Sequence, residues 1–166
     1  SKPAPVTSSP IFLSQGRGRS TNCPPVAILT RSLHYVDLDA VRNSYARCLM
    51  REDFIDRFYE IFIDSHPSIR PMFANTDFDA QINLLRQGLA CAFRFARGDS
   101  GAATSMDRFR ESHGRKGRIK VEPKLYPFWV NSMVTAANEC DPQFTPQLET
   151  EWRTVLSKAT VHMRSD

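Results

Sequence analysis

The chain has 166 residues, of which 41% are hydrophobic and 24% are charged, and its formal net charge is +4 at pH 7. This length suits one domain with a single buried core, and the composition excludes a disordered or fibrous chain. No apolar run approaches the ~20 residues that span a bilayer, and the first residues lack the apolar stretch of a signal peptide, so we expect a cytoplasmic protein without membrane contact.

The positive charge belongs to the first 32 residues alone. They contain four basic residues and no acid, whereas residues 33–166 contain 18 basic and 18 acidic residues. A nucleic-acid-binding domain concentrates basic side chains on one face, so we expect no nucleic-acid partner. Five prolines fall within the first 25 residues. We therefore predict an extended basic arm over 1–32 and a folded domain over 33–166.

From Asp37 onward, apolar residues recur at helical spacing, and no segment alternates as a strand would. The pattern predicts an all-α domain of six to eight helices. We expect helices over about 37–49, 51–64, 75–96, 102–113, 123–140 and 146–163, with a short helix or turn over 67–73. Asn75 or Thr76 is expected to cap the third helix, and Gly98 and Gly101 to end it.

The four cysteines are far apart and show no metal-binding spacing, which favours free thiols; they are Cys23, Cys48, Cys91 and Cys140. His113 differs from the other histidines because it ends a predicted helix with an apolar face behind it. A lone histidine at a helix end is usually a surface group that complements the helix dipole. Taken alone, this residue therefore leaves both a surface role and a ligand role open.

One segment carries a more specific pattern. Residues 58–73 read FYEIFIDSHPSIRPMF, an aromatic pair and an apolar pair followed by H-P-x-apolar-R-P-apolar-F. This segment resembles the B and C helices of bacterial globins, meaning single-domain bacterial haemoglobins and the haem domain of flavohaemoglobins. Residues 73–89 (FANTD...Q..LL...L) and 111–129 (ESHGRKG, then LY..W) resemble the same family. The resemblance extends over about 37–163.

The resemblance implies a globin fold around a haem b pocket. His113 would be the proximal ligand of the iron, as haem in globins requires. Phe73 would pack against the porphyrin, and Tyr126 would orient the His113 ring through a hydrogen bond.

On the opposite, distal side, the resemblance places Tyr59 and Gln81, with Leu85 one turn further along the same wall. A phenol O–H and an amide N–H are suitable donors for a polar diatomic ligand such as O₂. The alternatives are a core tyrosine at Tyr59 and a solvated glutamine at Gln81. A rotated helix would turn Ala80 or Leu84 inward instead.

The sequence also departs from the family. The loop from Gly114 to Pro123 is longer and more basic, and Arg115, Lys116 and Arg118 either pair with the haem propionates or are solvated. The carboxylate that flavohaemoglobin-like proteins place late in the last helix would fall beyond Asp166. No flavin or nicotinamide motif occurs, so NO dioxygenation would need an outside reductase.

Three functions remain at this point. The first is a haem globin that reversibly binds O₂, NO or CO, acting in oxygen transport or NO detoxification. The second is a globin gas or redox sensor that signals to a partner. The third is a haemless interaction domain, which the joint presence of His113, Phe73, Tyr59 and Gln81 argues against. No hydrolase or metalloenzyme motif supports an enzyme, and a homodimer through the last two helices is suggested by analogy alone.

Overall fold

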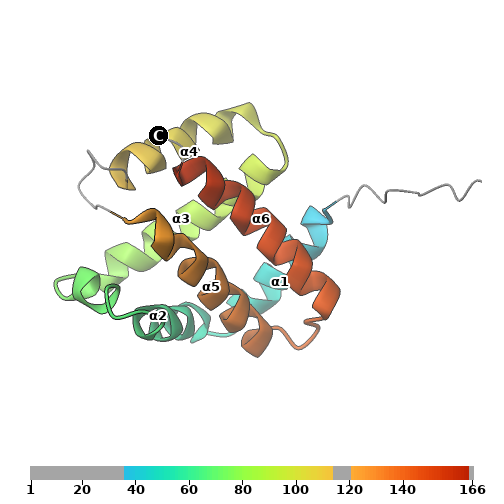
Figure 1. Ribbon diagram of the computed structural model, residues 1–166. Coiled ribbons are helices and arrows are strands. Elements are labelled where there is room, and N and C mark those ends of the chain that lie inside the picture. The colour runs from blue at the N-terminus through green and yellow to red at the C-terminus, as the bar shows by residue number, and fades with distance from the viewer. Residues whose placement is uncertain (1–35, 114–120, 165–166) are drawn as a thin grey trace, which may run out of the picture. The chain divides into compact units, whose positions relative to one another are not determined.

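The structure, a computed structural model, describes residues 36–113 and 121–164, except for the side chain of His113. The described residues form α-helices and short 3-10 helices and contain no strand, which confirms the all-α prediction for this part of the chain (Figure 1). The elements are α1 (Leu38–Leu49), α2 (Phe54–Asp64), η1 (Arg70–Phe73), α3 (Phe78–Ala96), α4 (Ser100–His113), η2 (Pro123–Leu125), α5 (Tyr126–Cys140) and α6 (Pro146–Arg164).

The start of α3 differs from the sequence prediction. The capping residue is Asp77, whose carboxylate accepts the N–H of Ala80 at 3.2 Å. Neither Asn75 nor Thr76 can cap the helix, because both lie in the turn that follows η1, where the Thr76 N–H donates to the carbonyl of Phe73.

The corner between α3 and α4 depends on one glycine and one aspartate. Gly98 has a φ of 89°, a left-handed conformation that glycine adopts without strain, and it ends α3 as predicted. Asp99 then caps α4 by accepting the N–H of Gly101 at 2.8 Å. The prediction that Gly101 ends a helix is therefore wrong, since Gly101 lies in the first turn of α4.

The core forms where α2 packs on α5, and where α6 crosses α1, α3 and α5 (Figure 1). Its largest fully buried side chains include Trp152, Phe54, Phe58, Leu89, Met133 and Leu156. A second, smaller cluster joins α3, α4 and α6 around Ala102 and Met106. The helix that carries His113 is thus held mainly by small side chains.

A buried carboxylate at the end of α5 joins three parts of the fold. Asp141 accepts hydrogen bonds from the Ser44 hydroxyl at 2.6 Å and from Arg47 through two nitrogens at 2.6 and 2.7 Å. The indole N–H of Trp152 donates to the same Ser44 hydroxyl at 3.0 Å. Since Ser44 and Arg47 lie on α1 and Trp152 lies on α6, the network fixes both helices to the α5–α6 turn.

The environment of Asp141 keeps it charged. Burial alone would raise the pKa of this carboxyl, but hydrogen bonds from Arg47, Ser44 and the backbone N–H of Gln143 outweigh burial and lower it. The folded state therefore binds the Asp141 proton less tightly than the unfolded chain does.

We predict that Asp141→Asn destabilises the protein by about 3–5 kcal/mol at pH 7, because it leaves Arg47 without its buried partner. Urea denaturation measures this difference. The difference in stability should have its full size above about pH 4, which is the pKa of an aspartate in the unfolded chain. It should disappear as the pH falls through the lower pKa of Asp141 in the folded protein. The matched control is Asp53→Asn, which removes an exposed partner of Arg51 and should have a much smaller effect, because solvent screens an exposed ion pair. Equal effects of the two substitutions would contradict the role of the buried network.

Candidate functional site

Tyr59 of α2 is the most deeply buried of the predicted distal residues. Its side chain is 5% exposed, and its hydroxyl donates to the backbone carbonyl of Gln81 at 3.3 Å. Burial raises the pKa of the phenol to about 12, although the side chain of Gln81 acts in the opposite direction. The hydroxyl therefore keeps its proton, as a hydrogen-bond donor must.

The orientation of α3 is consistent with the predicted face. Leu85 is buried and Gln81 is half-buried, whereas Leu84 is 49% exposed and Ala80 is exposed. The rotated alternative, with Ala80 or Leu84 turned inward, is therefore wrong. Tyr59 contacts Gln81 between α2 and α3, and Leu85 belongs to the same buried core cluster as Tyr59. Their role toward a ligand stays a prediction.

Three aromatic rings meet beside this contact. The Tyr59 ring lies 5.8 Å from Phe73 and 5.6 Å from Phe78 between ring centroids, and Phe73 and Phe78 stack at 6.2 Å. Phe78 is 40% exposed and Phe73 is half-buried, so part of this aromatic surface is uncovered. The sequence identified Phe78 only as an apolar helix position, because its contact with Phe73 depends on the turn after η1.

His113 is the last residue of α4, as predicted, and its side chain lies outside the described residues. The predicted propionate partners Arg115, Lys116 and Arg118 also lie outside them. The helix itself is attached to α6 by a contact between the His162 Nε2 and the Asp107 carboxylate, 2.9 Å apart.

Tyr126 begins α5 and is also buried. It lines a cavity of about 180 Å³ between α5 and α6, together with Arg153 and Arg164. Burial raises the pKa of its phenol, and the positive charge of Arg164 opposes that change. The structure therefore separates Tyr126, at the α5–α6 contact, from Tyr59, at the α2–α3 contact.

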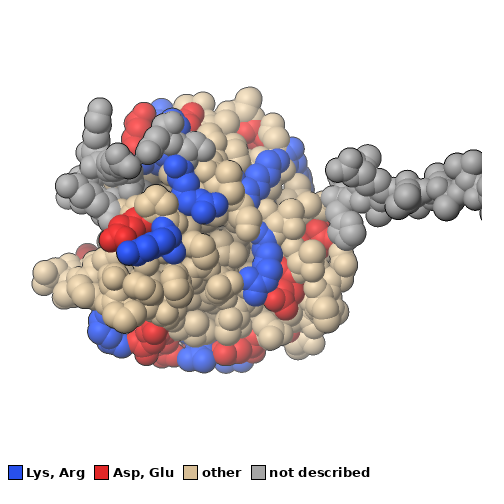
Figure 2. Space-filling view, viewed as in Figure 1, with Lys and Arg blue, Asp and Glu red and all other residues tan. Residues whose placement is uncertain are grey.

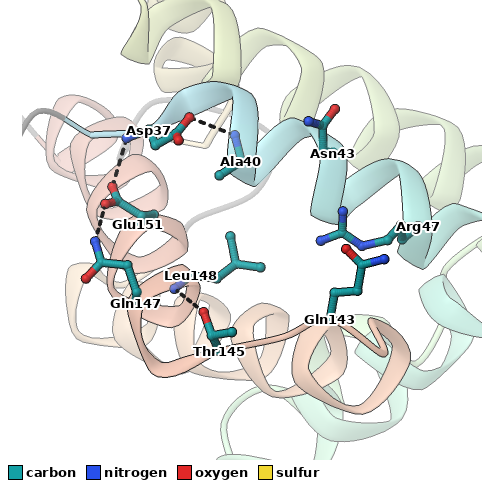
Figure 3. A pocket seen from close by; sticks show the side chains of 9 residues that line it. All are labelled: Asp37, Ala40, Asn43, Arg47, Gln143, Thr145, Gln147, Leu148 and Glu151. Atoms are coloured by element: carbon teal, nitrogen blue, oxygen red, sulfur yellow. Dashed lines mark hydrogen bonds between the residues drawn. The ribbon is translucent and has the colours of Figure 1, made fainter.

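A larger cavity of about 490 Å³ lies between α1 and the start of α6 (Figure 3). There the Glu151 carboxylate accepts the backbone N–H of Asp37 at 3.1 Å and the Gln147 amide at 2.6 Å (Figure 3). None of the predicted site residues lines this cavity. Its polar groups mainly connect the beginning of α1 to α6.

Other candidate chemistry is sparse in the described part of the chain. Cys48, Cys91 and Cys140 are free thiols, as predicted, and Cys23 lies outside the described residues. Among the described residues, no group of three or more potential metal-ligating side chains occurs, and none of their helices is long and apolar enough to cross a membrane.

The described residues fit a haem group by their chemistry. The uncovered rings of Phe73 and Phe78 offer an apolar surface to a flat macrocycle, and Tyr59 adds a buried protonated donor beside them. His113 is the residue type that ligates haem iron in globins.

We predict that Tyr59→Phe leaves the tyrosinate absorbance gained between pH 9 and 11 unchanged and removes a component that titrates near pH 12. Absorbance at about 295 nm, recorded within seconds of a pH jump, measures this, because an exposed phenol ionises at about pH 10. A loss of signal between pH 9 and 11 would show that the Tyr59 hydroxyl is open to solvent.

Comparison with known proteins finds no match among protein-family models and none among curated proteins. Among solved structures, the chain is similar to a protein of Pseudomonas aeruginosa PAO1 whose crystal structure is described as structurally highly homologous to a human hemoglobin. The two sequences are 33% identical, the TM-score is 0.73, and the match covers 76% of this chain and 95% of that one. With its all-helical fold, this level of identity and coverage shows that the chain belongs to the globin family.

Proposed function

We propose that the protein is a haem-binding globin that reversibly binds O₂ and other diatomic gases such as NO and CO, and that it acts in oxygen transport or NO detoxification. The observation that carries the proposal is the buried phenol of Tyr59, which contacts Gln81 of α3. The sequence resemblance to bacterial globins and the similarity to a protein described as homologous to human hemoglobin support it.

Haem b supplies an iron atom that can coordinate a diatomic gas. We propose that His113 ligates this iron, and that Phe73, Phe78 and Leu85 contact the macrocycle. The buried contacts of α4 through Ala102 and Met106 would hold the backbone of His113 in place. Tyr126 would accept a hydrogen bond from the second ring nitrogen of His113, which fixes the tautomer that can ligate a metal.

Tyr59 and Gln81 would provide the donors on the gas side. The 3.3 Å hydrogen bond of Tyr59 is long and ends on a backbone carbonyl, so the hydroxyl can turn toward a polar ligand at small cost. The half-buried side chain of Gln81 lies close enough to the phenol to lower its pKa, so its amide N–H would serve as the second donor. Such a pair slows the release of O₂ more than that of the less polar CO.

The first prediction concerns haem retention. The purified protein should show an intense Soret band that shifts on reduction with dithionite and again on exposure to CO. His113→Ala should abolish stable haem retention, or leave it only with added imidazole. The matched control is His66→Ala, which removes an imidazole that accepts only the backbone N–H of Ser68 in the described structure. Equal retention in both variants would disprove the ligand assignment.

The second prediction concerns gas release. Tyr59→Phe should speed O₂ dissociation about tenfold, because one hydrogen bond in a buried site contributes roughly 1–2 kcal/mol. Stopped-flow displacement of O₂ by CO measures the rate. Tyr45→Phe is the matched control, since that phenol packs against Phe93 and Trp152 in the other aromatic cluster. An unchanged rate of O₂ dissociation in Tyr59→Phe would remove Tyr59 from the gas site.

A separate assay distinguishes the two roles: sustained NO consumption by the protein with an added reductase would favour NO detoxification over oxygen transport.

A further inference from the structure

The cavity between α5 and α6 is lined by an unusual set of polar groups. It lies where the first turns of α5 meet the last turns of α6 (Figure 1) and has a volume of about 180 Å³. Its polar lining residues are Tyr126, Asn131, Arg153, Ser157, Thr160 and Arg164. No acidic side chain lines it among the described residues, so two guanidinium charges face the space without a carboxylate in its wall.

Tyr126 lines this cavity and is mostly buried. Tyr126 is 8% exposed, and no described residue forms a hydrogen bond with its hydroxyl. Arg164 lines the same cavity and acts on the phenol as a nearby positive charge. An anion in the cavity would therefore lie near both the phenol and this guanidinium group.

Arg153 is held in position at the edge of the cavity. Its Nε donates to the Glu149 carboxylate at 2.9 Å, and one terminal nitrogen donates to the Asn131 side-chain oxygen at 2.7 Å. Glu149 lies outside the cavity wall, and the ion pair leaves some of the five guanidinium N–H groups free. Because the oxygen of Asn131 is occupied by Arg153, its side-chain NH₂ remains as a further donor.

The free groups in this wall are therefore mainly donors, and two of them are cationic. A cation would be repelled by the guanidinium groups, and an apolar molecule would leave them without partners. A small oxyanion would accept from both arginines and from the phenol through charge-assisted hydrogen bonds. The volume of about 180 Å³ leaves room for phosphate or a short carboxylate.

Arg153 pairs with Glu149, as basic groups elsewhere on the surface pair with acids, whereas Arg164 forms no ion pair within the described residues. Lysine and arginine side chains are spread over the face in Figure 2, several of them beside acidic ones. Arg57, for example, pairs with Glu139 at 2.5 Å, and Arg97 pairs with Asp39 at 2.7 Å. The α5–α6 cavity, which is partly open to solvent, thus brings two guanidinium groups and a mostly buried phenol together in one place.

We propose that the cavity between α5 and α6 is a binding site for a small oxyanion, either phosphate or a carboxylate of a few carbon atoms, held by Arg153 and Arg164 with a hydrogen bond from Tyr126. The site does not depend on the proposed haem function, since all three residues and the space between them are present in the chain itself. The Tyr126 hydroxyl donates its own proton to the anion, so it can still accept a hydrogen bond from His113.

The test is a titration of the ¹⁵N-labelled full chain with sodium phosphate and, separately, sodium acetate, at an ionic strength held constant with sodium chloride. Saturable shifts of backbone amide signals from the start of α5 and the end of α6 are expected with at least one of the two anions. The anion that saturates at the lower concentration identifies the class. Shifts that are absent, linear in concentration or spread over the whole surface would overturn the proposal.

Three variants localise the binding. Arg164→Gln removes an exposed charge and should weaken the affinity for the anion about tenfold or more. Tyr126→Phe keeps the ring but removes the hydroxyl, and it should weaken the affinity about threefold to tenfold. Arg42→Gln makes the same charge change on α1, where Arg42 pairs only with Asp39, and should leave binding unchanged. Equal weakening by Arg164→Gln and Arg42→Gln would show general charge attraction and would disprove the site.

Discussion

The fold depends on keeping one carboxylate charged inside the protein. Asp141 has no exposed side-chain surface, and a buried charge is tolerated only when its partners replace the lost water. Ser44 and Arg47 do this from α1, and Trp152 completes the network from α6. Because Ser44 and Arg47 lie 97 and 94 residues away along the chain, this single group fixes how α1, α6 and the end of α5 meet.

The position of the candidate gas site follows from this arrangement. α2 packs along α5, whose end is held at Asp141, and the Arg57–Glu139 pair connects the same two helices at the surface. With α2 oriented in this way, the Tyr59 side chain is directed toward α3, where it meets Gln81 and Phe78. The buried phenol is thus a result of helix packing rather than of any local motif.

The helix that ends at His113 is held differently. α4 contacts α3 and α6 through a separate cluster of small buried residues, together with the contact between Asp107 and His162. The two sides of the proposed haem pocket therefore rest on different packing clusters. The same helix, α6, takes part in both clusters and also forms one wall of the α5–α6 cavity, so it connects all three regions.

The sequence by itself determined the helices, because apolar periodicity, prolines and capping residues are local signals. Its resemblance to bacterial globins assigned Tyr59, Gln81 and Leu85 to one side of a haem pocket, which stays a prediction. The sequence misplaced the cap of α3, since Asn75, Thr76 and Asp77 are all good capping residues and only the turn after η1 selects Asp77. The sequence showed Asp141 only as a helix break before a proline. The partners of Asp141 became visible only in the tertiary structure, as did the position of Tyr126 in one cavity with Arg153 and Arg164. The physical reason is that contacts between distant segments leave no periodic pattern in the sequence.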